Sequence, residues 1–429
     1  MKEKPEPSMR LIAAASLAGS ALEWFDYFLY GTAAALVFNV IMFPGGDKFV
    51  GLLLAYSTLA LGFLVRPLGA VYFGGLGDRI GRKKVLVLTL VLMGAATTLI
   101  GFVPPFSVAG YWAPIALTLL RLLQGFGAGA EFGGAVIFAA ENSENRRGFY
   151  GSIPGVGVYI GLLLGAGAFA LLAQLPREDF LTWGWRIPFL SSALLIGVAL
   201  LIRLKLTETA AFNELKESGG ISDTPVRDVL RDNRKSLVIV AGSQAAQSGV
   251  SYVYQTFVVS YVAVTLGMSP SVGPTGVAIA AAVAVFTTPL FGALSDRLGR
   301  KRTYLFGPVF LAVFAFPFFW LVSSGTSAGV ILAMSLGIGL GLAAMLGVQG
   351  AFYCELFPAS TRFSGMALGR EVSAALAGGL SPLAAVALVN WAGGAWWPVA
   401  LLTLGLSLVS IASILAAPET FRPKTQTAK

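Results

Sequence analysis

The chain has 429 residues, of which 56% are hydrophobic and 12% are charged, and its mean hydropathy is +0.77. A chain of this composition cannot cover itself with polar side chains in water, so the sequence excludes a soluble globular protein and predicts an integral membrane protein. The formal net charge of +9 does not indicate a nucleic-acid partner, because the basic residues lie in short turns between apolar segments. With no histidine and one cysteine, Cys354, we predict no disulfide, no metal and no cofactor.

Twelve apolar segments reach the length of about 20 residues that a membrane-spanning helix needs. They lie at 11–40, 50–76, 85–103, 111–140, 148–174, 187–205, 236–265, 272–295, 303–322, 328–354, 362–389 and 396–417. The first segment contains two acids and is therefore predicted to be an uncleaved membrane helix rather than a secretory signal. We predict an all-α protein with an N-terminal six-helix bundle (1–205), a cytoplasmic linker (206–235) and a C-terminal six-helix bundle with a short cytoplasmic tail (236–429).

A basic turn occurs at matching places in the two halves. Its copies, Phe73–Lys84 and Phe291–Arg302, agree at eight of twelve positions and are 218 residues apart. Such a repeat predicts two homologous bundles joined in one chain. When the N-terminus, the even-numbered turns and the C-terminus are placed on one side, that side holds 24 of the 30 lysines and arginines. The positive-inside rule then predicts that both termini are cytoplasmic.

The duplicated turn resembles the signature of the major facilitator superfamily, and Arg121–Ala128 is similar to its second motif. Three stretches resemble the metabolite:H⁺ symporter family: Glu23–Tyr27, Arg66–Gly69 and Trp183–Phe189. Two more, Tyr30–Asn39 and Gly110–Pro114, look closest to its shikimate-type branch. The resemblance implies two pseudo-symmetric bundles with the site at their interface near mid-membrane. It also implies proton-coupled import of shikimate or a related small organic acid by alternating access, in the plasma (cell inner) membrane.

Ionisable residues inside membrane spans are candidates for function, because a charge at mid-membrane costs at least about 2.5 kcal/mol. Glu23 and Asp26 are three residues apart on the first span, so they share a helix face with Tyr27 and Tyr30. Two carboxylates this close titrate as a coupled pair, which suits reversible protonation in a chain without histidine. We predict that Asp26 and Glu23, together with Arg121 of the fourth span, couple protons. The alternative is that one of them pairs permanently with an arginine.

Arg121 lies near the middle of the fourth span, with Gln124 one turn further on. A guanidinium binds a carboxylate through two hydrogen bonds, so Arg121 is a candidate for the substrate's carboxylate. It could also stand beside an acid and change that acid's protonation when substrate arrives, or form a fixed bridge. Glu131 is flanked by glycines, and the sequence leaves it open between proton coupling and a structural contact.

Polar residues recur at spacings of three and four in the seventh span, which predicts a face turned to a cavity or to another helix. We predict substrate binding there, with interhelical hydrogen bonding as the alternative. Arg370 and Glu371 depart from the branch, where an uncharged Tyr-Gln pair is usual. Since adjacent positions are about 100° apart, either one faces the cavity or both pair with neighbours. The predicted substrate-binding residues are Arg121, Gln124, Tyr27, Tyr30, Gln244, Gln247, Ser251, Tyr254, Gln349, Arg370 and Glu371.

The basic turns and the segments after spans four and ten predict a cytoplasmic gate, in which Asp78 and Asp296 bind arginines or cap helix N-termini. The predicted gate residues are Asp78, Arg79, Arg82, Glu141, Arg147, Asp296, Arg297, Arg300, Glu355 and Arg362. Arg66, beside Pro67, is interpreted as structural or gate-related. Glycines four residues apart, at Gly157, Gly161 and Gly165, predict close helix packing.

We therefore predict a monomeric, proton-coupled symporter of a small organic acid or polar metabolite, embedded in the lipid bilayer, with protons as the coupling ion. The alternatives are symport of di- or tricarboxylates such as 2-oxoglutarate and citrate, or of zwitterionic solutes such as betaine and proline. A drug-efflux antiporter shares the basic turn and the Arg121 motif but lacks the Glu23–Tyr27 stretch. An enzyme would need a nucleophile or metal ligands, and we predict no enzymatic activity.

Overall fold

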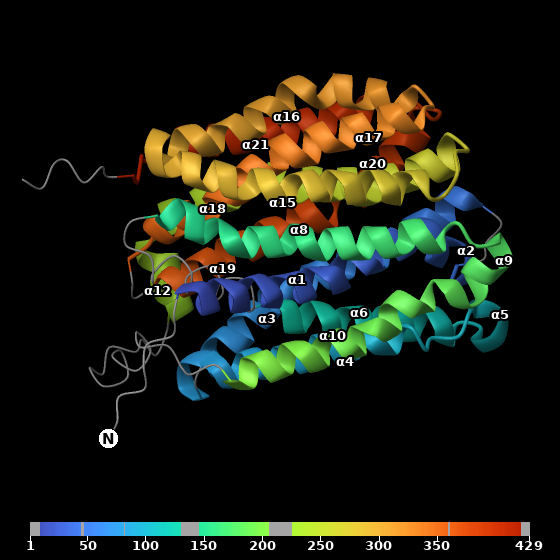
Figure 1. The fold of residues 1–429 in the computed structure, drawn as a ribbon, viewed down its shortest axis with the longest axis horizontal. Coiled ribbons are helices and arrows are strands. Elements are labelled where there is room, and N and C mark those ends of the chain that lie inside the picture. The colour runs from blue at the N-terminus through green and yellow to red at the C-terminus, as the bar shows by residue number, and fades with distance from the viewer. Residues whose placement is uncertain are drawn as a thin grey trace, which may run out of the picture.

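The computed structural model describes residues 9–43, 47–80, 82–129, 146–205, 225–358 and 361–421. Within these ranges all regular secondary structure is helical, and the long helices lie side by side along the long axis of the molecule (Figure 1). They form the predicted twelve spans, arranged as two pseudo-symmetric six-helix bundles. Nine helices in the described ranges are clearly long and apolar enough to cross a membrane. Of the other three, α4 has a shorter apolar run, Val87–Ile100.

The first bundle contains spans one to six. Its elements are α1 (Met9–Ala33), the π-helical η1 (Ala34–Phe38), α2 (Asn39–Ile41), α3 (Lys48–Ile80), α4 (Arg82–Ile100), α5 (Phe106–Ala109), α6 (Trp112–Ala128), α8 (Arg147–Leu172), α9 (Arg177–Asp179), the π-helical η2 (Phe180–Gly184) and α10 (Arg186–Lys205). Apart from the short α5, these elements build the spans, and the candidate span Arg177–Leu201 includes α9 and η2. The helix of the second span runs through most of the first basic turn, to Ile80, rather than ending before it.

The second bundle contains spans seven to twelve. Its elements are α13 (Arg234–Tyr252), η3 (Val253–Phe257), α14 (Val258–Ser260), η4 (Tyr261–Thr265), α15 (Val272–Leu298), α16 (Arg300–Ser323), α17 (Ser327–Leu336), η5 (Gly337–Leu342), α18 (Ala343–Glu355), α19 (Arg362–Ser373), η6 (Ala374–Gly379), α20 (Ser381–Trp391) and α21 (Trp397–Leu415). The second basic turn is made at Gly299, whose φ of 99° favours glycine.

The predicted linker is helical in its last part, where α12 (Pro225–Asp232) lies beside α13. Residues 206–224 lie outside the described ranges, and the exact boundaries of the two bundles remain a prediction.

Glycines bring α8 close to α1. A Cβ atom on Gly157 would lie 2.5 Å from the carbonyl oxygen of Leu17, and one on Gly161 would lie 2.4 Å from that of Ala21. No larger residue fits at these positions without moving one helix, so the predicted role of this glycine pattern in packing is confirmed. On its other side α8 packs along α15, and this packing is the principal contact between the two bundles (Figure 1).

Glycines also bring α3 against α6. A Cβ on Gly125 would lie 2.0 Å from the carbonyl oxygen of Gly62, and one on Gly69 would lie 2.0 Å from that of Phe126. Because the two backbones touch, the side chain of Arg121, one turn before Gly125 on α6, must extend across the surface of α3. This contact fixes the position of Arg121.

We expect Gly161→Ala to destabilise the protein by about 1–3 kcal/mol, because the new methyl group overlaps the backbone of α1. The measurement is the apparent midpoint of thermal unfolding in detergent. The control is Gly167→Ala on the same helix, where an added Cβ meets nothing within 4 Å. Equal midpoints for the two variants would contradict the close α1–α8 contact.

Candidate functional site

Arg121 is fully buried at the interface of the two bundles. Its Nη1 donates to Oε1 of Gln124, and Gln124 donates through Nε2 to Thr97 Oγ1 at 2.8 Å. The guanidinium carbon lies 4.7 Å from the ring centre of Tyr27 and 4.3 Å from that of Tyr30. Nε and Nη2 have no hydrogen-bond partner among the described residues. Arg121 is therefore a buried cation with two donor groups still available.

The backbone of α3 leaves room for this side chain. A Cβ on Gly62 would lie 2.6 Å from Arg121 Nε, so the guanidinium rests directly on the helix backbone. Tyr30, on the other side, is held by a hydrogen bond of 2.5 Å between its hydroxyl and Thr58 Oγ1. The site residues Arg121, Gln124, Tyr27 and Tyr30, predicted separately from two spans, are thus brought together.

A second arginine, Arg66 of α3, forms an ion pair across the bundle interface. Its Nε and Nη2 donate to Oε2 and Oε1 of Glu371 in α19, at 2.5 and 2.9 Å. Both side chains are buried. Arg370 Nη1 lies 3.6 Å from Glu371 Oε1, and its guanidinium faces the ring of Trp24 at 5.4 Å. Of the two predicted arrangements, the one in which both residues of the Arg370-Glu371 pair contact neighbouring helices is therefore found.

Sequence reasoning did not assign Arg66 to the site. Its guanidinium carbon lies 4.8 Å from the ring centre of Tyr27, the same ring that Arg121 faces. A signal was present, because Glu371 is the only acid well inside a span of the second half and Arg66 is a cation well inside a span of the first. Two such charges in apolar spans are expected to neutralise each other.

Glu23 and Asp26 are both buried on α1. Asp26 accepts a hydrogen bond of 2.6 Å from Ser192 Oγ of α10. Glu23 lies close enough to Arg66 and Arg370 for its charge to interact with theirs. Asp26 therefore contacts α10, and Glu23 lies beside the arginine cluster.

Tyr252 of α13 is a site residue that the sequence prediction omitted. Its ring packs edge-on against Phe63 with 4.8 Å between ring centres, and its buried hydroxyl has no partner in the described part of the chain. The hydroxyl is close enough to Arg66 and Arg121 to interact with their charges. Tyr252 thus extends from the second bundle toward the arginines of the first.

The polar face of the seventh span is largely engaged within its own bundle. Gln244 donates to Gln247 Oε1 at 2.5 Å and accepts from the Tyr353 hydroxyl at 3.2 Å. Tyr353 in turn contacts Ser243 Oγ at 2.8 Å and the Tyr304 hydroxyl at 2.9 Å. For Gln244 the alternative of interhelical hydrogen bonding therefore describes this conformation.

The other predicted residues of the second bundle differ from one another. Ser251 is buried on α13. Tyr254 stacks on Phe318 of α16 with 3.6 Å between ring centres, inside its own bundle. Gln349 of α18 is buried, and neither atom of its side-chain amide has a hydrogen-bond partner among the described residues. Gln349 therefore has hydrogen-bonding groups available for a ligand, whereas the ring of Tyr254 is used in packing.

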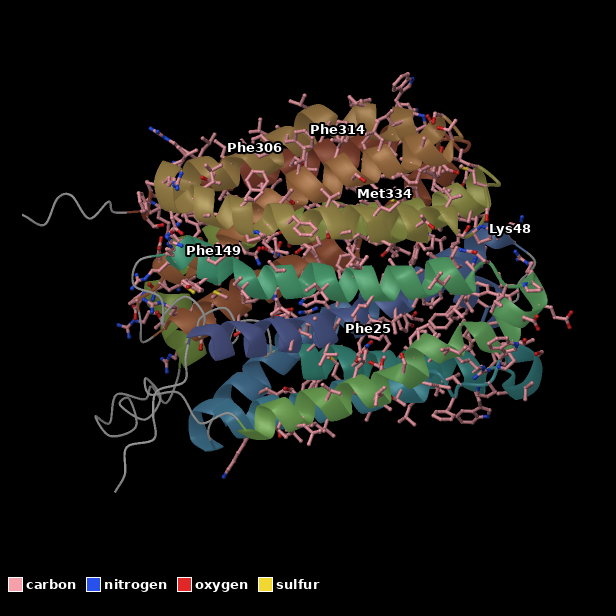
Figure 2. The ribbon with its side chains drawn as sticks, in the orientation of Figure 1. Phe25, Lys48, Phe149, Phe306, Phe314 and Met334 are labelled. Carbon is pink, nitrogen blue, oxygen red and sulfur yellow. The ribbon has the colours of Figure 1, made fainter. Side chains whose placement is uncertain are left out.

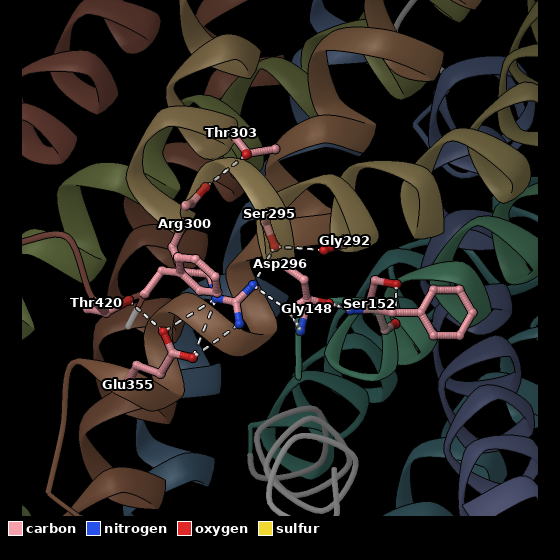
Figure 3. Close-up of polar contacts among 12 residues, drawn as sticks. Gly148, Ser152, Gly292, Ser295, Asp296, Arg300, Thr303, Glu355 and Thr420 are labelled. Carbon is pink, nitrogen blue, oxygen red and sulfur yellow. Dashed lines mark hydrogen bonds and ion pairs between the residues drawn. The ribbon is translucent and has the colours of Figure 1, made fainter. Parts of the chain in front are cut away.

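Asp296 joins the bundles at the end of the molecule near Phe149, which we call the basic end (Figures 2 and 3). Its carboxylate accepts hydrogen bonds from the backbone N–H groups of Gly148 and Phe149 at 2.8 and 3.0 Å. It thereby caps the N-terminus of α8. Arg300 Nη1 donates to Asp296 at 2.8 Å and its other nitrogens face Glu355 at 3.4 Å. The predicted capping and arginine-binding roles of Asp296 are both confirmed.

Of the remaining predicted gate residues, Glu355 is engaged by Arg300 and Thr420, and several others lie outside the described part of the structure. Arg147 and Arg297 are exposed, and Arg362 is half-buried. The side chains of Asp78, Arg79, Arg82, Glu131 and Glu141 lie outside the described residues. Sequence reasoning missed Glu419 and Thr420 of the C-terminal segment. Glu419 accepts from the backbone N–H of Arg300 at 2.9 Å, and Thr420 donates to Glu355 at 2.5 Å.

The bundles also touch toward the other end of the molecule, where Lys48 lies (Figure 2). Tyr56, in the first third of α3, donates to the carbonyl oxygen of Thr256 at 3.0 Å and contacts Ser260 Oγ at 2.9 Å. Contacts between the bundles therefore lie on both sides of the arginine cluster. The side chains of the cluster itself are buried.

Twelve long helices whose buried charges gather between two bundles are the arrangement of a membrane transporter. The Major Facilitator Superfamily model matches residues 16–382 and 240–429. The shikimate transporter of Escherichia coli strain K12 is 36% identical over 417 residues, covering 96% of this chain and 95% of that protein. The proline/betaine transporter of Salmonella typhimurium strain LT2 is 37% identical over 395 residues, covering 89% of this chain and 78% of that protein.

Solved structures show the same fold. The proton:xylose symporter XylE bound to 6-bromo-6-deoxy-D-glucose superposes with a TM-score of 0.76 at 16% identity, over 96% of each chain. The chain therefore belongs to the Major Facilitator Superfamily, and the resemblance inferred from its motifs is confirmed. Its relatives are transporters rather than enzymes.

We expect Asp296→Ala to loosen the basic end, because the N-terminus of α8 loses its cap and Arg300 loses a partner. Loss of such a cap costs about 1 kcal/mol, which corresponds to about fivefold more open protein. The single cysteine, Cys354, is 5% exposed on α18 next to Glu355, and its rate of labelling by a maleimide in detergent reports this opening. The exposed Asp232→Ala is the control. An unchanged labelling rate in Asp296→Ala would contradict the idea that Asp296 holds the two bundles together at the basic end.

Proposed function

We propose that the chain is a proton-coupled symporter that imports a small organic acid, such as shikimate or a related carboxylate, by alternating access. It would act as a monomer in the plasma (cell inner) membrane with both termini in the cytoplasm. The orientation rests on the distribution of basic residues along the sequence. The substrate class rests on the chemistry of Arg121 together with the relatives named above.

The observation that carries the proposal is the incomplete hydrogen bonding of Arg121. A buried cation without a carboxylate partner is unfavourable, and two of its nitrogens have no acceptor among the described residues. Nε and one Nη of a guanidinium form the fork that binds a carboxylate through two parallel hydrogen bonds. A substrate carboxylate would supply both the missing charge and the missing acceptors.

The surroundings of Arg121 favour an acid over a zwitterion such as betaine. A quaternary ammonium group is bound by open aromatic faces. Here the rings of Tyr27, Tyr30 and Phe63 already face guanidinium groups, at 4.3 to 5.7 Å from their centres. A second cation at the same rings would be repelled. The proline/betaine relatives keep zwitterions as the alternative substrate class.

Asp26 is our candidate for the proton-coupling group, with Glu23 beside the arginine cluster as a second acid. Asp26 is buried, and Ser192 is a hydrogen-bond partner that can donate to the ionised carboxylate or accept from the protonated one. Alternating access would proceed by breaking the contacts at the basic end and at Tyr56 in turn. We propose that Asp296 and Arg300 form the cytoplasmic gate.

The test is uptake by proteoliposomes under an imposed pH gradient, with shikimate, 2-oxoglutarate, citrate and betaine as probes. We expect gradient-driven uptake of at least one acid, and about a hundredfold loss in Arg121→Gln because its fork for the carboxylate is removed. The exposed Arg177→Gln, which makes the same charge change, is expected to transport normally. Uptake of betaine but of no acid would replace the proposal by its alternative, and uptake of no probe would refute it.

We expect Asp26→Asn to abolish gradient-driven uptake while leaving exchange of labelled for unlabelled substrate partly intact. An amide keeps the shape of the side chain but cannot carry the proton. Both activities are measured in the same proteoliposomes, with the exposed Asp232→Asn as the control. If exchange is lost together with driven uptake, Asp26 has a role in binding or folding instead.

A further inference from the structure

The centre of the protein contains two carboxylate-binding forks beside one aromatic ring. The guanidinium carbons of Arg66 and Arg121 each lie within 5 Å of the ring centre of Tyr27, so they are less than about 10 Å apart. Their charges interact with each other. On chemistry alone, such a pair of cations would suit a substrate with two carboxylates.

One of these forks is already filled from within the chain. Both carboxylate oxygens of Glu371 accept hydrogen bonds from Arg66, at 2.5 and 2.9 Å. This is the two-bond geometry that a free carboxylate adopts on a guanidinium. Glu371 belongs to α19 and Arg66 to α3, so the acid reaches across the bundle interface to take this position.

The other fork has no such occupant. Arg121 has hydrogen-bond partners on Nη1 only, and no ion pair connects it to a carboxylate of the described chain. The hydroxyl groups of Tyr27 and Tyr252 also have no hydrogen-bond partner in the described ranges. The site thus offers one charged fork and neutral polar groups around it.

We infer that Glu371 determines the charge of the substrate: it occupies the second fork as an internal carboxylate and restricts the site to monocarboxylates with an uncharged polar body. A dicarboxylate could place one carboxylate on Arg121. Its other carboxylate would find Arg66 already bound to Glu371 and Arg370 beside that same carboxylate. It would be buried without a fork of its own, or would have to displace Glu371 from Arg66. This inference rests on the proposed function, because it assumes that Arg121 receives a substrate carboxylate.

The test compares a monocarboxylate and a dicarboxylate in the same proteoliposomes. The probes are shikimate and succinate, and the readout is the ratio of their half-saturation concentrations for uptake. For the wild type we expect a preference for shikimate. In Glu371→Gln, Arg66 loses its internal carboxylate, and we expect the ratio to shift toward succinate about tenfold or more. The exposed Glu178→Gln makes the same charge change and is expected to leave the ratio unaltered.

A charge-matched double variant separates specificity from damage to the fold. Arg66→Gln combined with Glu371→Gln removes both charges, so no fork is vacated and the preference for shikimate is expected to return. If Glu371→Gln does not fold, the wild type and the double variant still test whether the site is restricted to monocarboxylates. A preference for succinate in either protein would overturn the inference.

The outcomes distinguish the inference from the function on which it rests. A wild type that transports neither acid would refute the proposed function. A wild type that transports shikimate, together with a Glu371→Gln protein whose ratio is unchanged, would refute only the role of Glu371.

Discussion

A guanidinium group buried in an apolar interior needs a counter-charge or a full set of hydrogen bonds, and this constraint organises the centre of the protein. Three buried arginines satisfy this requirement in different ways. Arg66 has a carboxylate from the other bundle, and Arg370 lies beside that same carboxylate and the ring of Trp24. Arg121 has an amide and two aromatic faces. The site is therefore defined by the one of these three arginines that forms no ion pair with a carboxylate of the described chain.

Besides the packing of α8 along α15, a few directional bonds join the two bundles. A capped helix, a buried ion pair and a tyrosine hydroxyl form contacts at three levels along the spans. Between α8 and α15 the backbones touch, since a Cβ on Gly148 would lie 2.3 Å from the carbonyl oxygen of Gly292. In the proposed alternating access, these separate bonds would break in turn.

The spans, the two related halves and the contact between Asp296 and Arg300 were predictable because they depend on local sequence. The helix that Asp296 caps is 148 positions away, and the sequence did not specify it. Length and hydropathy define spans, and a duplicated turn identifies related halves. The arginine cluster was only partly predictable. Arg66 and Glu371 are 305 positions apart, and no local pattern specifies which spans meet. The direction of Tyr254 depends on a π-helical segment, η3, because a wider turn changes which face a residue occupies. Hydrophobic periodicity does not reveal such a segment.

The π-helical segments in spans one, seven, ten and eleven change the angle around the helix axis between the residues before them and the residues after them. In a straight α-helix, residues eight positions apart would be offset by about 80° around the axis. Tyr30 and Phe38, on either side of most of η1, nevertheless meet edge-to-face with 5.2 Å between ring centres. The wider turn therefore sets the angle around the helix axis between the acidic N-terminal part of the first span and its C-terminal part. Deleting one residue there would rotate the C-terminal part by about 100° and leave the chemistry of the N-terminal part in place.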